Sequence, residues 1–141
     1  MRVLGIDMGL KRTGLAVSDE EGIAIRHLPN LIAHSRDAAL KKIMDLVKEL
    51  LIKAIVIGQP EAKTTGSKAI SSRALGFKIA LEEALKAQDL EVKVFLVNEE
   101  YSSKKALANL VKAGVSKKNR KILLDSASAA ILVEDFLREK F

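Results

Sequence analysis

Three carboxylates stand at points where one predicted element gives way to the next, and together they could bind divalent metal ions. Asp7 closes an apolar strand, Glu99 follows another apolar strand, and Asp125 precedes the apolar stripe of the last helix. Crowded carboxylates repel one another unless a cation unites them, and oxygen ligands suit Mg²⁺ or Mn²⁺. Two such ions, about 3.5–4 Å apart, can activate a water and stabilise the leaving oxygen of a phosphodiester. In such a site we expect Asp7 to bridge the ions.

Each of these carboxylates also has a simpler explanation. Asp7 could be a hydrogen-bonded residue of an ordinary hairpin, although an ionised group at the end of a buried strand is costly without a cation or donors. Glu99 could favour the positive N-terminal end of a following helix, and Asp125 could be a helix N-cap. Gly5 and Gly9, on either side of Asp7, would let a phosphate or a metal approach the backbone.

The positive charge of the chain is concentrated in two segments. Residues 62–81 and 101–124 contain eleven lysines and arginines and no acid, whereas the net charge of the whole chain is +6. Such concentration favours binding to a phosphate backbone, although Lys-rich helices often simply present solvated faces. The candidate contacts to nucleic acid are Arg12, Lys63, Lys68, Arg73, Lys104, Lys105, Lys117, Lys118, Arg120 and Lys121.

The hydrophobic pattern predicts an α/β fold with a mixed five-stranded sheet flanked by helices. The expected order is strand-strand-strand-helix-strand-helix-strand-helix-helix. The strands are expected over residues 2–7, 13–18, 23–32, 54–58 and 92–97, and the helices over 35–50, 70–85, 102–111 and 125–136. Ser35 is expected to cap the first helix, and Pro29 suggests an edge strand.

Right-handed crossovers would make the first, fourth and fifth strands parallel, so that their carboxyl ends share one edge of the sheet. Asp7, Glu99 and both basic segments would then converge on that edge, where ligand sites are favoured. His27 and His34 are expected to lie away from it in ordinary surface or turn roles. Lys117, Lys118, Arg120 and Lys121 are expected in a solvated loop that becomes ordered on nucleic acid.

Length and composition bound the setting. At 141 residues, the chain suits one domain over residues 1–141. It has no cysteine, so disulfides and thiolate metal sites are excluded. Met1 leads directly into the first strand and no apolar run reaches membrane-spanning length, so we expect a soluble cytoplasmic protein without a membrane partner.

Several segments together resemble one known family. They are Gly5-Ile6-Asp7-Met8-Gly9 with 12–19, Gly58-Gln59-Pro60 leading to Gly66-Ser67, Asn98-Glu99-Glu100, and 125–130. This combination, which spans essentially the whole chain, resembles the YqgF (RuvX) family. That family has a ribonuclease H-like fold and is similar to Holliday-junction resolvases. Its members are assigned to processing the 5′ end of pre-16S ribosomal RNA.

The resemblance implies a metal-dependent hydrolase with Asp7, Glu99 and Asp125 as an acidic triad, leaving 3′-hydroxyl and 5′-phosphate ends. It favours RNA over DNA as the partner, and a monomer or weak homodimer. The family usually has Asp-Glu-Arg where this chain has Asn98-Glu99-Glu100, so one flanking acid has become an amide and an arginine has become an acid. Glu100 is therefore a reserve candidate as a metal ligand. Glu61 is a second one, because Gln59 stands where the family commonly has an apolar residue and Glu61 follows it.

Three other functions remain open from the sequence. A Holliday-junction resolvase would use the same acidic site on DNA. A non-catalytic nucleic-acid-binding module would explain the altered residues Asn98 and Glu100. The Asp-x-Gly opening also resembles the first phosphate-binding hairpin of the actin, heat-shock ATPase and sugar-kinase superfamily, but those enzymes need two lobes, for which this chain is too short.

Overall fold

The computed structural model describes residues 1–8, 13–59, 65–98 and 108–140. For residues 59, 65–72, 98, 118, 120–126 and 140 the description covers the backbone alone. The elements are β1 (Arg2–Met8), β2 (Thr13–Ser18), β3 (Ile25–Leu31), α1 (Arg36–Leu50), β4 (Ile52–Gln59), α2 (Thr65–Ala87), β5 (Lys93–Asn98) and α4 (Lys117–Lys140). A further helical stretch occupies 108–112. No helix within these ranges is long and apolar enough to span a membrane.

The five strands form one mixed sheet in the order β3-β2-β1-β4-β5. β1, β4 and β5 are parallel to one another, and β2 is antiparallel to both β1 and β3. The prediction that the first, fourth and fifth strands share a carboxyl edge is therefore confirmed. β3, which contains Pro29, lies at the edge of the sheet as expected.

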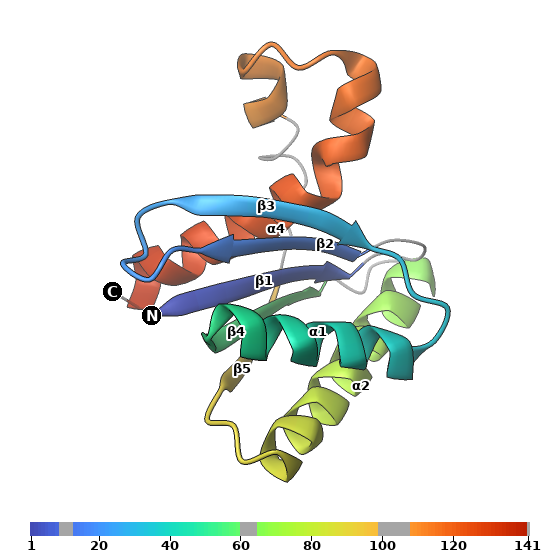
Figure 1. The fold of residues 1–141 in the computed structure, drawn as a ribbon. Coiled ribbons are helices and arrows are strands. Elements are labelled where there is room, and N and C mark those ends of the chain that lie inside the picture. Colours follow the sequence, from blue (N-terminus) through green and yellow to red (C-terminus); the bar gives the residue numbers. More distant parts are fainter. Residues whose placement is uncertain (9–12, 60–64, 99–107, 141) are drawn as a thin grey trace.

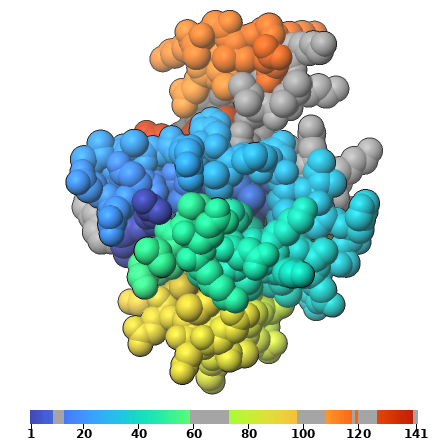
Figure 2. Space-filling model, viewed as in Figure 1, coloured from blue at the N-terminus to red at the C-terminus, as the bar shows by residue number. Residues whose placement is uncertain are grey.

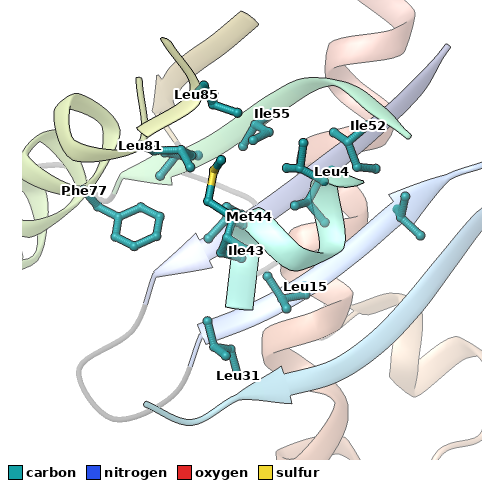
Figure 3. Packing of buried hydrophobic residues seen from close by; sticks show 14 of the residues in the cluster. Leu4, Leu15, Leu31, Ile43, Met44, Ile52, Ile55, Phe77, Leu81 and Leu85 are labelled. Atoms are coloured by element: carbon teal, nitrogen blue, oxygen red, sulfur yellow. The ribbon is translucent and has the colours of Figure 1, made fainter. Parts of the chain in front are cut away.

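Helices cover both faces of the sheet. α1 and α2 lie on one face, whereas α4 crosses the other face behind β1, β2 and β3 (Figure 1). The predicted cap of α1 is confirmed, because the backbone N–H of Ala38 donates to the Ser35 hydroxyl at 3.1 Å. Large aliphatic side chains fill the α1/α2 face, including Ile43, Ile55 and Leu81 (Figure 3). A smaller cluster under α4 contains Val3, Ala54, Val56, Leu132, Val133 and Phe136.

The start of the last helix differs from the prediction, since α4 begins at Lys117 and not near Asp125. Gly114, with φ +75°, ends the preceding helical stretch, and the Val115 N–H donates to the Leu110 carbonyl at 3.0 Å. This is the hydrogen bond of a Schellman motif, and Val115 packs beside Leu110 as that motif requires. The Ser116 hydroxyl then accepts from the Asn119 N–H at 3.3 Å and caps the new helix.

The basic residues at 117–121 thus lie in helical turns, and the prediction of a solvated loop is wrong. Lysine and arginine are good helix formers, so the absence of an apolar stripe did not prevent a helix there. The stretch 108–112 and the first turns of α4 form a helical arm that stands out from the body of the molecule (Figures 1 and 2). Leu110 and Val115 form a small apolar cluster with Ala127 and Ile131 of α4, whereas Val111 is 50 % exposed.

Candidate active site at the carboxyl edge of the sheet

Asp7 is buried at the carboxyl end of the central strand, with glycines beside it. It is only 8 % exposed. Its antiparallel neighbour across β2 is Gly14, and its parallel neighbour across β4 is Gly58. Residues directly opposite on adjacent strands present their side chains to the same face, so neither neighbour places a side chain beside the carboxylate. Glycines in such positions are typical where a ligand or another backbone approaches a sheet closely.

The position of Gly14 and Gly58 on either side of Asp7 was not anticipated from the sequence. Gly14 and Gly58 interrupt strands that are otherwise rich in valine, isoleucine and leucine. A glycine inside such a strand marks a close approach of a ligand or of another backbone. That signal was available, but only the register of the sheet shows that both glycines flank the same aspartate.

Gly5 has a different use from the one expected, because it makes room for α4. A Cβ atom at this position would lie 2.5 Å from the Ala129 carbonyl oxygen and 2.6 Å from Val133 Cγ2. Val3, two residues earlier in β1, packs in the cluster that contains Val133 and Phe136. α4 therefore runs antiparallel to β1, and the helix backbone lies directly against the strand.

This packing determines which part of α4 reaches the Asp7 end of β1. Residue 125 lies four positions, or about one turn, before Ala129. Two residues of β1 rise about 6.6 Å, close to the 5.4 Å of one helical turn. The turn that contains residue 125 is thus at the end of β1 that carries Asp7. Asp125 lies well inside α4, so the alternative that it is an N-cap is wrong.

The fifth strand brings its end to the same edge. Asn98 is the last residue of β5 and pairs with Gln59, while the preceding pair in β4 and β1 is Gly58 with Asp7. With β4 between them, β1 and β5 are about 10 Å apart. The candidates Glu61, Glu99 and Glu100 lie outside the described residues.

The donor chemistry of this edge fits a divalent cation as far as the described part extends. Asp7 supplies a buried carboxylate on a strand, and an oxygen donor of this kind suits Mg²⁺ or Mn²⁺. Among the side chains that the structure describes, no three acids or histidines gather as a complete metal site. Glu99 and the side chain of Asp125 are not among them.

The predicted nucleic-acid contacts fall on two helices. Arg73 is an exposed residue of α2, and Lys117 is exposed in the first turn of α4. The backbone of Lys68 lies in α2, and the backbones of Lys118, Arg120 and Lys121 lie in α4. The other candidates, Arg12, Lys63, Lys104 and Lys105, lie outside the described residues.

A cavity of about 440 Å³ opens beside the carboxyl end of β1, on the α1/α2 face. His34, Ser35, Arg36 and Arg73 contribute its polar lining. The prediction that His34 lies away from this edge is therefore wrong, because the chain after the edge strand β3 turns back past β1 before α1 begins. His27 behaves as predicted, as an exposed residue within β3.

The opposite edge of the sheet, at the amino ends of the parallel strands, has different features. Asp19, just after β2, accepts hydrogen bonds from the backbone N–H groups of Ile23 and Ala24 at 2.9 and 3.1 Å. These bonds, that from Ile23 first, lower the pKa of Asp19 below its ordinary value of 3.8. A larger cavity, about 1110 Å³, also lies at this end, between Lys53, Lys93 and Phe136. Both features are at the amino ends of the parallel strands, away from Asp7.

A mixed five-stranded sheet with this strand order and a carboxylate on its central strand is the fold of ribonuclease H-like resolvases. RuvC from Thermus thermophilus, solved with a Holliday junction substrate, has a TM-score of 0.62 at 20% identity, over 99% of this chain and 97% of the other. The fowlpox virus resolvase, solved with Holliday junction DNA, has a TM-score of 0.57 at 13% identity, over 99% and 98%. At these identities the likeness establishes the fold.

The chain belongs to the RuvX family, described as Holliday junction resolvase, whose model matches residues 1–139. A relative from Geobacillus kaustophilus is 31% identical over 99% of both chains, and one from Flavobacterium johnsoniae is 33% identical over 99% of this chain and 97% of its own. Both carry the name "Putative pre-16S rRNA nuclease". Family and fold together place this protein among the hydrolases that act on nucleic acid.

Proposed function

We propose that this protein is a divalent-metal-dependent endonuclease that processes structured RNA, with the 5′ end of pre-16S ribosomal RNA as its substrate. Residues 1–141 act as one nuclease domain, as a monomer or weak homodimer, in the cytoplasm. The observation that carries the proposal is the buried carboxylate of Asp7, flanked by Gly14 and Gly58 at the edge where the turn containing residue 125 also lies.

Asp7, Glu99 and Asp125 would hold the metal, with Glu61 and Glu100 in reserve. When bound, two Mg²⁺ or Mn²⁺ ions supply water activation and stabilisation of the leaving oxygen. The residues of the chain position these groups: Asp7 is fixed by the pairing of β1 on both sides, and the turn with residue 125 is fixed by the contact of α4 with Gly5. Packing of this kind supplies the rigidity that a reactive geometry requires.

The helical arm gives the substrate a second place to bind. Lys112 and Lys117 are exposed on it, and Lys118, Arg120 and Lys121 follow within the same helix. The arm includes the first turns of α4, and the same helix continues from these turns to residue 125 (Figure 1). A cationic helix in this position would contact phosphates of an RNA whose scissile bond lies at Asp7.

The decisive test compares Asp7→Asn with Asp45→Asn, a control at an exposed position of α1. Each protein is incubated with a 5′-extended 16S precursor transcript, with single-stranded RNA and with a four-way DNA junction, in Mg²⁺, Mn²⁺ or EDTA. Asp7→Asn should lose on the order of 10²–10³-fold in rate, as expected for one preorganised electrostatic group. Asp45→Asn should cleave like the wild type.

The substrates separate the remaining possibilities. The family description and the RuvC fold favour a junction resolvase as the second candidate, and paired symmetric incisions in the DNA junction would select it. Salt-sensitive binding without metal-dependent cleavage would select the non-catalytic module. Equal cleavage by the wild type and Asp7→Asn would contradict the assignment of the site.

A further inference from the structure

The cavity on the α1/α2 face of the carboxyl edge is built like an anion site. Three of its described lining residues, His34, Arg36 and Arg73, have basic side chains, and none of the described lining residues is acidic. Asp37, in the first turn of α1, is exposed and is not part of the lining. Met8, Leu31 and Phe77 contribute apolar surface to the same cavity.

Two arginines from different helices converge here. Arg36 opens α1, and Arg73 lies on α2. Arg36 Nη1 lies only 3.2 Å from the place that a Cβ atom would occupy at Gly76. Gly76 and Arg73 are three residues apart, so they are neighbours on the surface of α2. The Arg36 guanidinium therefore crosses from α1 to the part of α2 that carries Arg73.

Gly76 leaves room for the end of the Arg36 side chain, and a glycine here has a cost. A glycine inside a helix is about 1 kcal/mol less favourable than alanine. The planar fork of a guanidinium matches the oxygens of a phosphate, and two forks from different directions fix its position.

The cavity adjoins the catalytic edge. Met8 and Thr13, which line it, form the register pair next to Asp7 and Gly14. This pair is one residue, about 3.3 Å, further along β1 than Asp7. Met8 packs against the α1/α2 core, whereas Asp7 alternates with it and faces the α4 side. A strand crossing the carboxyl edge of the sheet would thus meet Asp7 on one side and the cavity on the other.

We propose that this cavity binds one backbone phosphate of the nucleic-acid strand, held by Arg36, Arg73 and His34, and so fixes the position of that strand relative to Asp7. The proposal deepens the function proposed above and rests on it. The function proposed above assigns no role to His34 or Arg36 and gives Arg73 only a general role in binding nucleic acid. The cavity gives all three residues one ligand, a backbone phosphate.

The test measures binding separately from cleavage. Asp7→Asn protein in EDTA, in which cleavage during the titration should be negligible, is titrated with the 16S precursor transcript over a series of salt concentrations, alone and combined with Arg36→Gln, Arg73→Gln or His34→Gln. The control is Lys48→Gln, which removes an exposed charge from the other end of α1. Each arginine variant should weaken binding about tenfold, the loss expected for one hydrogen bond to a charged group.

The salt dependence and a free anion make the test specific. Loss of one phosphate contact should make the slope of log K against log salt shallower by about one unit, and Lys48→Gln should leave it unchanged. Inorganic phosphate should raise the Tm of the wild type relative to chloride at equal ionic strength, and the Arg36→Gln/Arg73→Gln variant should lose that shift. Glutamine has a helix propensity close to that of arginine, so the arginine variants should remain folded.

The two proposals fail in different ways. Unchanged slopes in both arginine variants, or equal phosphate shifts in the wild type and the double variant, would overturn the phosphate site while leaving metal-dependent cleavage intact. A wild type that cleaves none of the substrates would overturn the proposed nuclease, whereas an arginine-dependent phosphate shift in that protein would still support the anion site.

Discussion

The two faces of the sheet are packed by opposite means. On the α1/α2 face, large side chains such as Ile43, Ile55 and Leu81 keep the helices at a distance from the strands (Figure 3). On the α4 face, Gly5, Ala16 and Ala54 leave little bulk, and the helix backbone comes down onto β1. One face is a deep hydrophobic core, and the other is a close contact between backbones.

This difference assigns the two faces different tasks. A core of large side chains supplies most of the hydrophobic stabilisation and tolerates some repacking. A close contact of backbones tolerates less, because a carbonyl oxygen cannot swing aside as a side chain can. Since the backbone of residue 125 lies in α4, the close contact would also set how far that backbone lies from Asp7. Stability and site geometry should therefore respond to substitutions on different faces.

The largest expected effect on stability comes from the α1/α2 face. Ile43→Ala removes a fully buried side chain of α1 and should lower the free energy of unfolding by about 2–5 kcal/mol. The cleavage rate per folded molecule should stay close to that of the wild type, because α1 and α4 cover opposite faces of the sheet. Urea unfolding and single-turnover cleavage at low temperature measure the two quantities. Lys41→Ala, an exposed neighbour on the same helix, is the control and should change neither.

Gly5→Ala should show the reverse pattern on the α4 face. The new Cβ atom would overlap the Ala129 carbonyl oxygen, so α4 must move away from β1. Overpacking of this kind costs about 1–3 kcal/mol, less than the loss expected for Ile43→Ala. The cleavage rate should nevertheless fall by at least about tenfold, since an error of 1 Å in a reactive geometry can cost 10²-fold.

A second glycine serves as the control for stability. Gly76→Ala places its Cβ atom beside the flexible end of Arg36 and not beside backbone, so the helix should gain stability, up to about 1 kcal/mol. If Gly5→Ala loses no more activity than its loss of folded protein explains, the close contact of α4 does not set the geometry of the site.

The sequence predicted the fold because local pattern and topology agree over most of the chain. Apolar runs marked the strands, Ser35 marked the start of α1, and the rule of right-handed crossovers made three strands parallel. Asp7 was singled out for a physical reason that the structure bears out, since it is a buried carboxylate at the end of the central strand.

The errors have two causes. Charge and composition concealed a local helix boundary, and the other two features depend on contacts between separate parts of the chain. The cluster of bases at 117–121 suggested a loop, but Gly114 and Ser116 are a helix stop and a helix start in succession. The use of Gly5 depends on a helix more than 120 residues away in the sequence. The position of His34 depends on the path of the chain between β3 and α1. No local pattern contains such distances.

A smaller effect on stability is expected at the end of α1. Leu51 ends this helix in the left-handed region, with φ 55° and ψ 49°, and its side chain is 68 % exposed. A side chain in this region costs about 1–2 kcal/mol. Glycine avoids this cost, but it loses more conformational entropy on folding, so the net gain is smaller. Leu51→Gly should therefore raise the free energy of unfolding by up to about 1 kcal/mol at an unchanged m-value.

Asp89→Gly is the matched substitution for this prediction. Asp89 has φ 56°, but aspartate adopts the left-handed region more readily than leucine, so the gain should be smaller. Neither substitution changes a residue packed on a face of the sheet, so both variants should cleave like the wild type. A loss of stability in Leu51→Gly would show that the exposed leucine has a packing role.

The smallest effect is expected at Asp19, which belongs to neither face. Its lowered pKa means that the folded state holds the ionised carboxylate better than the unfolded chain does. This stabilisation is present above the ordinary value of 3.8 and is lost as the pH falls through the lower folded value. Asp19→Asn should thus have a slightly lower Tm than the wild type near pH 6, and the difference should shrink toward about pH 2. A constant difference across that range would contradict this account, because the contribution of the ionised carboxylate, whose two oxygens accept separately from the Ile23 and Ala24 N–H groups, must be lost when the carboxylate is protonated.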